Sequence, residues 1–320
     1  MGIRSLSTAS IANGVKRDQF WDQSATVSYF LAVAFGSNVS ATSYDGINWT
    51  SRTMPSSANW YALWWNGSMF VIQTNAQTTS AYSADGITWT TGSLGTGYAW
   101  AQTAYGAGKW VTIGQNGGGP FAYSTDGHIW TAGTINAGEA YAGVAFGNGY
   151  FVASGTTANA SNSLAYSSNG TSWSFTTLPA TTGWGQVYYG ANGGFLVTNN
   201  VSNNYIAQSS TGTGSWTSRT LPASTGWGGC LAYGNGLWSY FTNGSTQAAS
   251  STDGINWTNR TSPSNAGWSK MYYNTKSNKW VAVASGAGTS NVAATSPDGL
   301  TWTLRTLPST SNWAALSANG

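Results

Sequence analysis

The stretch Ser43-Tyr44-Asp45-Gly46-Ile47-Asn48-Trp49 decides the fold, because its pattern Ser-x-Asp-Gly-x-x-Trp recurs along the whole chain. Four more complete copies occupy residues 83–89, 124–130, 251–257 and 296–302. Two degenerate copies fill the gap: residues 167–173 carry Asn169 in place of the Asp, and residues 210–216 have lost it. The copies close on Trp49, Trp89, Trp130, Trp173, Trp216, Trp257 and Trp302, which are 40, 41, 43, 43, 41 and 45 residues apart. A period of about 42 residues is typical of propellers and solenoids.

A second aromatic marker fixes the register of the repeat. It lies eleven residues after each closing Trp, at Trp60, Trp100, Tyr141, Trp184, Trp227, Trp268 and Trp313. In five repeats a Pro stands six residues after the closing Trp and predicts a linker, at Pro55, Pro179, Pro222, Pro263 and Pro308. The second repeat divides into four short strands, at residues 60–65, 69–73, 80–83 and 88–91. Four strands in about 42 residues is the size of one propeller blade.

The two ends of the chain complete each other. Residues 312–320 match residues 59–67 and therefore form a first strand that stops at its turn. The second strand that should follow stands at the other end of the chain, at residues 29–33. A C-terminal strand that completes an N-terminal blade closes a ring and removes its exposed edges. The sequence therefore predicts an all-β fold, a closed seven-bladed β-propeller over residues 28–320, preceded by an extended arm at residues 1–27.

The composition excludes several other classes of protein. The 320 residues include 11 Lys and Arg against 8 Asp and Glu, and only 6% are charged, so no basic cluster awaits nucleic acid. One Cys, Cys230, and one His, His128, exclude a disulfide framework and an ordinary zinc site. We therefore expect no metal and no cofactor. No apolar stretch is long enough to insert into a membrane.

The repeated motif resembles the Asp-box (BNR-type) turn of sialidases and related propellers, which has one more residue between Asp and Gly. This resemblance covers the whole ring and implies a propeller fold, whereas Asp-boxes lie away from the catalytic centre in that family. We interpret the motif as structural: Asp and Ser accept hydrogen bonds from the turn, Gly takes a positive φ and Trp packs between blades. Calcium or ligand binding by these carboxylates is the alternative. They are Asp45, Asp85, Asp126, Asp253 and Asp298.

Candidate catalytic residues are few. The resemblance implies three arginines on a substrate carboxylate, a Tyr–Glu pair and an acid/base Asp. The four arginines of the ring all stand three residues after a box Trp, which predicts a place in outer strands far from the axis. Glu139 is the only acid outside the boxes and the arm, whereas a glycosidase needs two carboxylates at one bond. We therefore expect no catalytic residues and a protein that is not an enzyme.

The loops between the second and third strands differ between repeats and are rich in amides and hydroxyls. Such loops on a rigid ring suit sugar hydroxyls and neutral partners, and the alternative is that they are merely solvated. The candidate ligand-binding residues are Asn75, Gln77, Asn116, Asn159, Asn162, Asn199, Asn203 and Tyr205. The second aromatic markers either stack on sugars or pack between blades, and packing is the favoured interpretation.

The ring arginines form a candidate docking arc, because ring closure makes their four blades consecutive. They are Arg52, Arg219, Arg260 and Arg305. Docking onto an acidic neighbour is the functional interpretation. The alternative is that these charges prevent strand-to-strand aggregation at the blade edges.

Residues 1–27 belong to no blade, and Lys16, Arg17, Phe20 and Trp21 are candidates for an attachment arm, with a disordered leader as the alternative. A Ser/Thr/Ala-rich arm before a compact β-module resembles the attachment peptides of tailed-bacteriophage virion proteins. The low charge and Gly/Ser/Thr/Asn richness resemble phage fibres and decoration proteins. These resemblances imply a virion protein, made in the host cytoplasm without a signal peptide and joined through its arm to other virion proteins of the capsid or tail. Its propeller would adhere to host-surface polysaccharide or reinforce the particle. A free carbohydrate-binding propeller lectin is the alternative.

Overall fold

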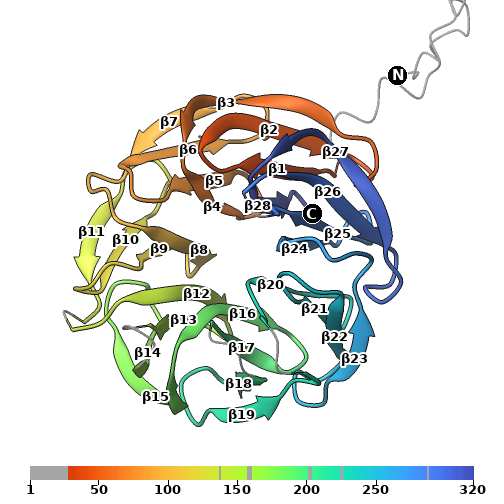
Figure 1. Cartoon of the computed structure of the whole chain (residues 1–320). Coiled ribbons are helices and arrows are strands. Elements are labelled where there is room, and N and C mark those ends of the chain that lie inside the picture. The colour runs from red at the N-terminus through yellow and green to blue at the C-terminus, as the bar shows by residue number, and fades with distance from the viewer. Residues whose placement is uncertain (1–27, 137, 157–160, 201–203, 224–225, 287) are drawn as a thin grey trace, which may run out of the picture.

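The computed structural model describes residues 28–136, 138–156, 161–200, 204–223, 226–286 and 288–320. These residues form 28 β-strands, which are arranged as seven four-stranded antiparallel sheets around a central axis (Figure 1). No described residue belongs to a helix that is long and apolar enough to cross a membrane. The all-β, closed seven-bladed propeller predicted from the repeat is confirmed.

Each blade contributes one inner, one second, one third and one outer strand. Blade 1 consists of β28 (Trp313–Ala318), β1 (Phe30–Ala34), β2 (Ser37–Ser43) and β3 (Thr50–Ala58). Blade 2 consists of β4 (Trp60–Trp65), β5 (Phe70–Thr74), β6 (Thr79–Ser83) and β7 (Thr90–Ser93), and blade 3 of β8 (Trp100–Gly106), β9 (Lys109–Gly114), β10 (Pro120–Ser124) and β11 (Thr131–Thr134). Blade 4 consists of β12 (Tyr141–Gly147), β13 (Tyr150–Gly155), β14 (Ser161–Ser167) and β15 (Ser174–Thr182), and blade 5 of β16 (Trp184–Gly190), β17 (Gly194–Asn199), β18 (Tyr205–Ser209) and β19 (Thr217–Thr220). Blade 6 consists of β20 (Cys230–Gly234), β21 (Leu237–Phe241), β22 (Gln247–Ser251) and β23 (Thr258–Thr261), and blade 7 of β24 (Trp268–Asn274), β25 (Lys279–Ala284), β26 (Ser290–Ser296) and β27 (Thr303–Ser311).

Blade 1 closes the ring in the predicted way. The inner strand β28 pairs antiparallel with β1, with Leu316 opposite Ala32. Beyond this ladder, the Tyr29 backbone N–H donates to Asn319 Oδ1 at 2.6 Å, and the Asn319 backbone N–H donates to the Tyr29 carbonyl at 3.2 Å. The two ends of the ring are therefore joined by main-chain pairing and by a reciprocal pair of hydrogen bonds.

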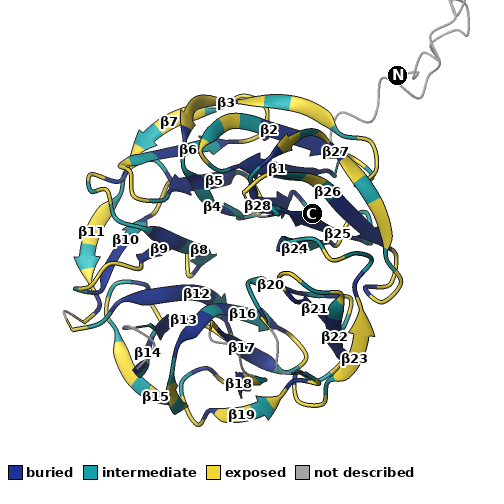
Figure 2. Ribbon diagram, viewed as in Figure 1, coloured by how far each residue is buried: buried dark blue, intermediate teal, exposed yellow. Residues whose placement is uncertain are grey.

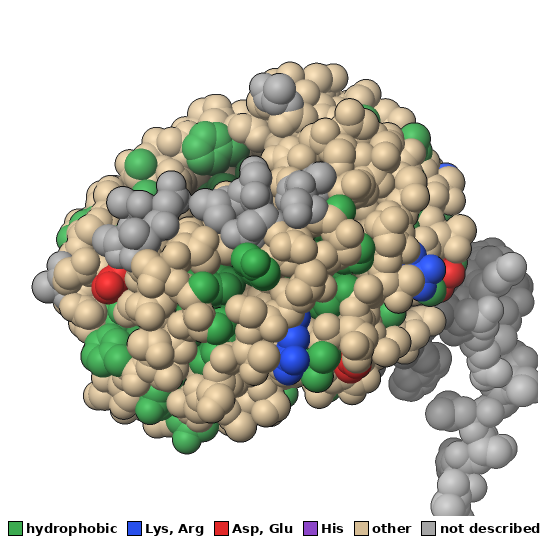
Figure 3. Space-filling model, turned by 60° about the horizontal axis from the view of Figure 1, so that its bottom comes forward, with side chains coloured by type: hydrophobic (Ala, Val, Ile, Leu, Met, Phe, Trp, Pro, Cys, Tyr) green, Lys and Arg blue, Asp and Glu red, His purple; other side chains and the backbone are tan. Residues whose placement is uncertain are grey.

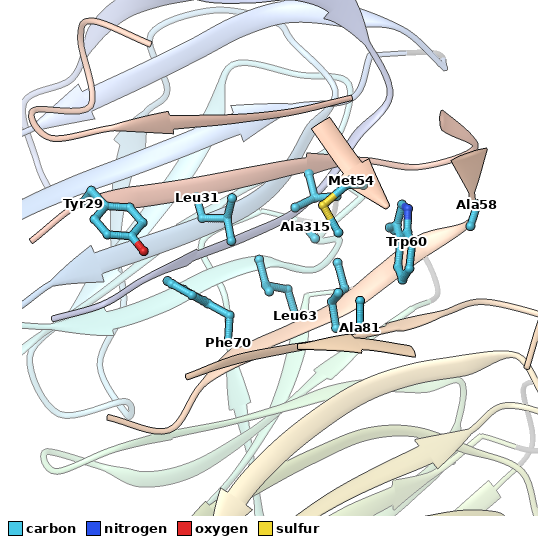
Figure 4. Packing of buried hydrophobic residues seen from close by; sticks show 11 residues of the cluster. Tyr29, Leu31, Met54, Ala58, Trp60, Leu63, Phe70, Ala81 and Ala315 are labelled. Atoms are coloured by element: carbon cyan, nitrogen blue, oxygen red, sulfur yellow. The ribbon is translucent and has the colours of Figure 1, made fainter. Parts of the chain in front are cut away.

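The core lies between the blades and consists mainly of the second aromatic markers and the strands around them. The second strands are almost entirely buried and the inner strands largely so, whereas the outer strands are mostly exposed (Figure 2). All seven second markers are at most 2% exposed, so packing, and not sugar stacking, is their role. Trp60 is typical: its indole N–H donates to the Ser56 carbonyl at 3.0 Å, and its ring packs with Met54 and Leu63 between blades 1 and 2 (Figure 4). Trp100, Trp184, Trp227, Trp268 and Trp313 make the same bond to the carbonyl four residues earlier.

The box Trp side chains are less buried than predicted. Six of the seven are half-buried, and only Trp216 is buried, at 8% exposed. In four boxes the indole N–H donates to the box Gly carbonyl, as from Trp89 to Gly86 at 3.3 Å. The second marker is therefore more deeply buried between blades than the box Trp. It lies at or just before the start of the inner strand, whereas the box Trp lies at the end of a turn on the edge of its blade.

The box turns share one hydrogen-bond pattern. Asp126 Oδ1 accepts the Ser124 hydroxyl at 2.9 Å and the backbone N–H groups of His128 and Ile129 at 2.8 and 2.9 Å. The same three bonds recur at Asp45, Asp85, Asp253 and Asp298. Asn169 keeps them with its amide oxygen, which explains why the acid is dispensable in blade 4.

The box of blade 5 has a different register from the one predicted. Its serine is Ser209, not Ser210, because Ser209 ends β18 and its hydroxyl oxygen accepts the Gly212 N–H at 3.1 Å. Thr211 then takes the place of the Asp, and one additional residue separates Gly212 from Trp216. The insertion hid the true start of this copy in the sequence.

Three of the five marker prolines do not lie in linkers. Pro55, Pro179 and Pro308 lie inside the nine-residue outer strands β3, β15 and β27. In β3 the pairing is interrupted between Thr53 and Ala58, so Pro55 occupies an unpaired stretch of an edge strand. Proline has no N–H to donate and is tolerated at such a position. Pro222 and Pro263 follow the short strands β19 and β23 and lie in connections, as predicted.

The ring has two different faces. One carries the connections from second to third strands and from each outer strand to the next inner strand; we call it the loop face. The other carries the short inner-to-second turns and the box turns; we call it the turn face. On the loop face, the first backbone N–H after the second strand donates to the carbonyl before the inner strand, as from Gln115 to Ala99 at 3.0 Å. This bond recurs in six blades, and in blade 6 its counterpart joins the N–H of Asn243, two residues after β21, to the carbonyl of Gly226, just before the marker Trp227. These bonds fix the loop face to the inner part of the ring.

Candidate functional site

Two cavities lie on the axis, one behind the other. The first, of about 400 Å³, opens on the loop face, and its lining includes Gln115, Asn243 and Asn312. The second, of about 410 Å³, is lined by the inner strands and by turn-face residues such as Asn235 and Thr275. The described residues that line both are Tyr61, Gln186, Gly229 and Lys270. We call these four residues the waist, because they separate the loop-face cavity from the turn-face cavity.

The waist is a hydrogen-bonded polar cluster around one cation. The Lys270 ammonium donates to Gln186 Oε1 at 3.2 Å, and it lies 5.3 Å from the centroid of the Tyr61 ring. The Tyr188 hydroxyl lies 2.6 Å from Gln186 Oε1 and 2.7 Å from the Gly229 carbonyl. Among the described residues the cation therefore has an amide oxygen and a ring face as partners, and no carboxylate side chain.

Gln102 ties three inner strands together next to the waist. Its Nε2 donates to the Val187 carbonyl at 3.0 Å, and its Oε1 accepts from the backbone N–H groups of Val144 and Val187 at 3.2 and 3.3 Å. It thus bridges blades 3, 4 and 5 across the axis. Gln102 is half-buried, and an amide with its donor and its acceptor both engaged makes the inner wall more rigid.

Gln102, Gln186 and Lys270 meet because they share one position of the repeat, the second residue after the aromatic marker. That position holds Ala62, Gln102, Gly143, Gln186, Gly229, Lys270 and Ala315. The long polar residues stand on blades 3, 5 and 7, and small residues stand on the blades between them. A Cβ on Gly229 would lie 2.6 Å from Gln186 Oε1, so this glycine provides the space that the Gln186 side chain occupies.

The loop-face cavity is lined by amides and hydroxyls with one aromatic corner. The side chains of Gln115, Asn243 and Asn312 make no hydrogen bond to the described part of the chain, and come from different parts of the ring. Phe35 and Tyr61 meet edge to face at the rim, with ring centroids 6.2 Å apart. The cavity therefore offers free amide donors and acceptors beside exposed ring surface.

The turn-face cavity is walled by aromatic rings. Its lining includes Tyr61, Trp64, Phe146, Tyr188, Tyr189, Tyr233, Tyr272 and Tyr273. Several of these rings lie over a glycine of the preceding blade, because a Cβ on Gly106, Gly147, Gly190 or Gly234 would overlap Phe146, Tyr189, Tyr233 or Tyr273 respectively. Each of these glycines thus leaves the space that an aromatic ring of the next blade occupies.

Among the described residues that line either cavity, Lys270 carries the only charged side chain. Burial raises the pKa of Tyr188 and of Tyr272 above the ordinary value, so both hydroxyls stay protonated at neutral pH. Burial likewise raises the pKa of the Cys230 thiol, although the nearby Lys270 acts in the opposite direction. Cys230 is therefore neutral, and no anion of the described inner wall compensates the cation.

The candidate ligand residues predicted from the loops do not form one site. The Gln77 amide oxygen accepts from the Asn59 N–H at 2.8 Å, and that of Asn116 accepts from the Ala99 N–H at 2.5 Å, so both hold the connection into an inner strand. Asn75 donates to the Trp100 carbonyl at 3.4 Å. None of these three is among the residues that line the two cavities.

The remaining loop candidates are dispersed. Asn199 is buried in β17 and donates to the Thr182 hydroxyl at 3.2 Å, Asn162 lies in β14, and Tyr205 begins β18 with 46% of its surface exposed. Asn159 and Asn203 lie outside the described residues, as do Lys16, Arg17, Phe20 and Trp21 of the proposed arm.

The four arginines of the docking arc lie on the outer strands of blades 5, 6, 7 and 1, which are consecutive around the ring. Each reaches across to the third strand of its own blade: Arg52, Arg260 and Arg305 donate through Nε to a hydroxyl at 2.9–3.0 Å, and Arg219 donates to Gln208 Oε1 at 3.0 Å. Charged side chains are sparse on the surface drawn in Figure 3, which is mostly uncharged and polar. Docking through this arc stays a prediction.

No group of three or more His, Cys, Asp or Glu that would suit a metal ion occurs among the described residues. The box carboxylates are separated around the ring, one to a blade, and each is engaged by its own turn. Their arrangement offers no shared ligand set.

The four waist residues and Gln102 were not among the predicted site residues. For Gln102, Gln186, Gly229 and Lys270 the signal in the sequence is a single repeat column, which becomes visible only when the copies are aligned on the second aromatic marker, whereas Tyr61 stands one position before that column. Along that column, long polar residues alternate with Ala and Gly, whereas the neighbouring inner-strand positions are mostly apolar.

These features define a seven-bladed propeller with a constricted axial channel. No protein-family model and no curated protein sequence matches the chain. Solved structures share its fold. A streptogramin B lyase structure has a TM-score of 0.67 at 14% identity, with 88% of each chain covered. A protein of unknown function from Desulfotomaculum acetoxidans has a TM-score of 0.67 at 9% identity, over 91% of this chain and 98% of the other. YCF48 bound to a D1 peptide has a TM-score of 0.61 at 16% identity, over 78% and 81%. At such identities the likeness shows the fold alone.

The expectation that this protein is not an enzyme is wrong as an inference from the fold and the missing glycosidase residues. The streptogramin B lyase structure, and the virginiamycin B lyase of Staphylococcus aureus at 15% identity, are enzymes built on the same propeller. The argument considered only the two-carboxylate chemistry of glycosidases, and a lyase is a different reaction class. The Asp-box family and a phage origin find no support in these comparisons either.

Proposed function

We propose that the chain is a glycan-binding propeller that holds a surface polysaccharide in its loop-face cavity. The observation that carries the proposal is the set of three free amides, Gln115, Asn243 and Asn312, that line this cavity at the axis. Amides both donate and accept, as sugar hydroxyls do, so each amide can pair with a hydroxyl in either direction.

The aromatic corner supports the same ligand class. Phe35 and Tyr61 are half-buried and present ring surface beside the amides. A sugar has an apolar face of C–H groups as well as hydroxyls, and a site that combines a few polar groups with ring surface matches both. The proposed site therefore moves from the separate loops to the axis, where the chains of all blades converge.

We further propose the setting that the sequence suggested, a bacteriophage particle that displays the propeller and holds it through residues 1–27. In that setting the loop face would contact the host surface. A free lectin would bind the same glycan equally well without residues 1–27, whereas a virion protein that lacks them would be missing from purified particles.

The test of glycan binding uses the full-length chain and a panel of purified bacterial surface polysaccharides, at physiological and at high salt. The double variant Gln115→Ala, Asn243→Ala should bind about tenfold more weakly, because each lost hydrogen bond contributes about 0.5–1.5 kcal/mol. The variant Asn259→Ala is the control, since it removes an exposed amide from the outer strand β23 and should bind as the native chain does.

Binding that persists in high salt would support an uncharged contact, since salt screens charge–charge attraction. Equal affinity of the double variant and the native chain would refute the loop-face site. Failure of the native chain to bind any polysaccharide of the panel would refute glycan binding.

A further inference from the structure

We propose that the turn-face cavity is a second, separate binding site, which takes a flat aromatic molecule carrying one negative charge. Its rings would lie between the aromatic walls, and its anionic group would point inward to Lys270 at the waist. This site differs from the proposed glycan site in its mouth, its lining and its ligand chemistry.

The walls are rigid before any ligand arrives. Tyr189 lies over Gly147, Tyr233 over Gly190 and Tyr273 over Gly234, each in space that a side chain on the glycine would fill. Each of these ring-over-glycine contacts joins one blade to the next. A cavity whose walls are already in place loses little conformational freedom on binding.

The tyrosines present ring carbon, not hydroxyl, to the cavity. The Tyr189 hydroxyl donates to Asn148 Oδ1 at 2.7 Å, and the Tyr233 oxygen accepts the Asn192 N–H at 3.1 Å. The Tyr273 hydroxyl bonds to Asn278, and that of Tyr188 is bonded at the waist. Because these polar tips have protein partners, the remaining surface of the four rings is apolar and suits stacking on a flat ring.

The charge of the Lys270 side chain indicates which polar group the ligand should carry. Lys270 carries the only charged side chain among the described residues that line the cavity, and its described partners are the Gln186 amide oxygen and the Tyr61 ring. A cation without a carboxylate partner at the inner end of an apolar cavity favours an anionic group there, through a charge-assisted hydrogen bond. A volume of about 410 Å³ lies in the range of pockets that hold small organic ligands.

The test uses two fluorescent probes that share a ring system. Anilinonaphthalene sulfonate carries one negative charge, and N-phenylnaphthylamine has the same rings without it. We expect both to bind the full-length native chain at one site. Lys270→Met should weaken the sulfonate by about tenfold and leave the neutral amine within about twofold, since only the sulfonate loses a charged partner. Lys109→Met, at the start of β9, removes a cation that lines neither cavity and should change neither affinity.

Two matched substitutions locate the site. Ala62, on β4, lines only the turn-face cavity, and Ala314, on β28, lines only the loop-face cavity. Ala62→Phe should abolish binding of both probes, and Ala314→Phe should leave it unchanged. The melting temperature of each variant shows whether it folds. The comparison of the two probes on Lys270→Met does not depend on either Phe variant.

Three results would overturn the proposal: no probe binding to the native chain, loss of binding in Ala314→Phe with retention in Ala62→Phe, or equal weakening of both probes by Lys270→Met. The glycan proposal fails independently, because polysaccharide binding should be lost in Ala314→Phe and kept in Ala62→Phe.

Discussion

Blade 2 holds two tryptophans whose truncation should have very different costs. Trp60, the second marker, is fully buried between blades 1 and 2, and its indole N–H donates to the Ser56 carbonyl at 3.0 Å. Trp89, the box residue, is half-buried, and its indole N–H donates to the Gly86 carbonyl at 3.3 Å. Both substitutions to Ala remove the same atoms from the same blade. The difference between their effects on the free energy of unfolding therefore reports how deeply each ring is buried.

The magnitudes follow from burial. Truncation of a fully buried Trp costs about 3–5 kcal/mol of unfolding free energy, which includes the cavity left behind. A half-buried ring loses about half of its transfer free energy, and the open side leaves no closed cavity, so Trp89→Ala should cost about 1.5–2.5 kcal/mol. We therefore expect Trp60→Ala to be the more damaging change by about 2 kcal/mol.

Urea unfolding followed by far-ultraviolet circular dichroism gives the free energy of unfolding of the native chain and both variants. Circular dichroism is preferable to Trp fluorescence, because the substitutions change the fluorophores. An equal cost for the two variants, or a larger cost for Trp89→Ala, would refute the argument that the second marker is the principal wedge between blades.

Two further predictions concern single blades. Gly147→Ala should destabilise the protein by about 1–3 kcal/mol in the same urea assay, because its Cβ would overlap the Tyr189 ring, whereas Gly117→Ala, in open space, should change stability by less than about 0.5 kcal/mol. Hydrogen bonds from its own turn lower the pKa of Asp45 from 3.8 to about 2, against the opposing effect of burial, so the carboxylate stabilises the fold above pH 4 and that stabilisation is lost as the pH falls through 2. Thermal melts between pH 5 and 2 should show this loss, and Asp45→Asn, which imitates Asn169 of blade 4, should reduce it; a variant that melts with the native pH profile would contradict this role.

Most of the fold was predictable from the sequence, because a propeller repeats one four-stranded blade seven times and each copy leaves the same pattern. The box turn and the second marker each recur at fixed spacing, and the inner strand predicted at residues 60–65 is β4 (Trp60–Trp65). Ring closure was predictable for the same reason, since residues 312–320 match an inner strand. The register of the box in blade 5 was not predictable, because one inserted residue places the start of the box at Ser209, while a second serine, Ser210, stands in the expected place.

The candidate site was much less predictable. Gln77 and Asn116 look like free loop amides in the sequence, but the path of each loop brings them onto the backbone N–H of a connection. Lys270 is one inner-strand residue among seven aligned ones, and only the ring geometry places it beside Gln186 of another blade. Contacts between side chains of different blades depend on closure of the whole ring, so they cannot be predicted from a local sequence pattern.

The joint between β28 and β1 also has a consequence for how the protein is made. Tyr29 and Asn319, which exchange hydrogen bonds across this joint, are 290 positions apart in the chain. During synthesis β1 emerges early and keeps an unpaired edge until β28 leaves the ribosome, so blade 1 is completed last. Contacts of such long sequence separation slow folding, because a long loop must be ordered before they form. A chain that still lacks β28 therefore exposes an unpaired β1 edge, and such an edge is prone to pairing with another chain.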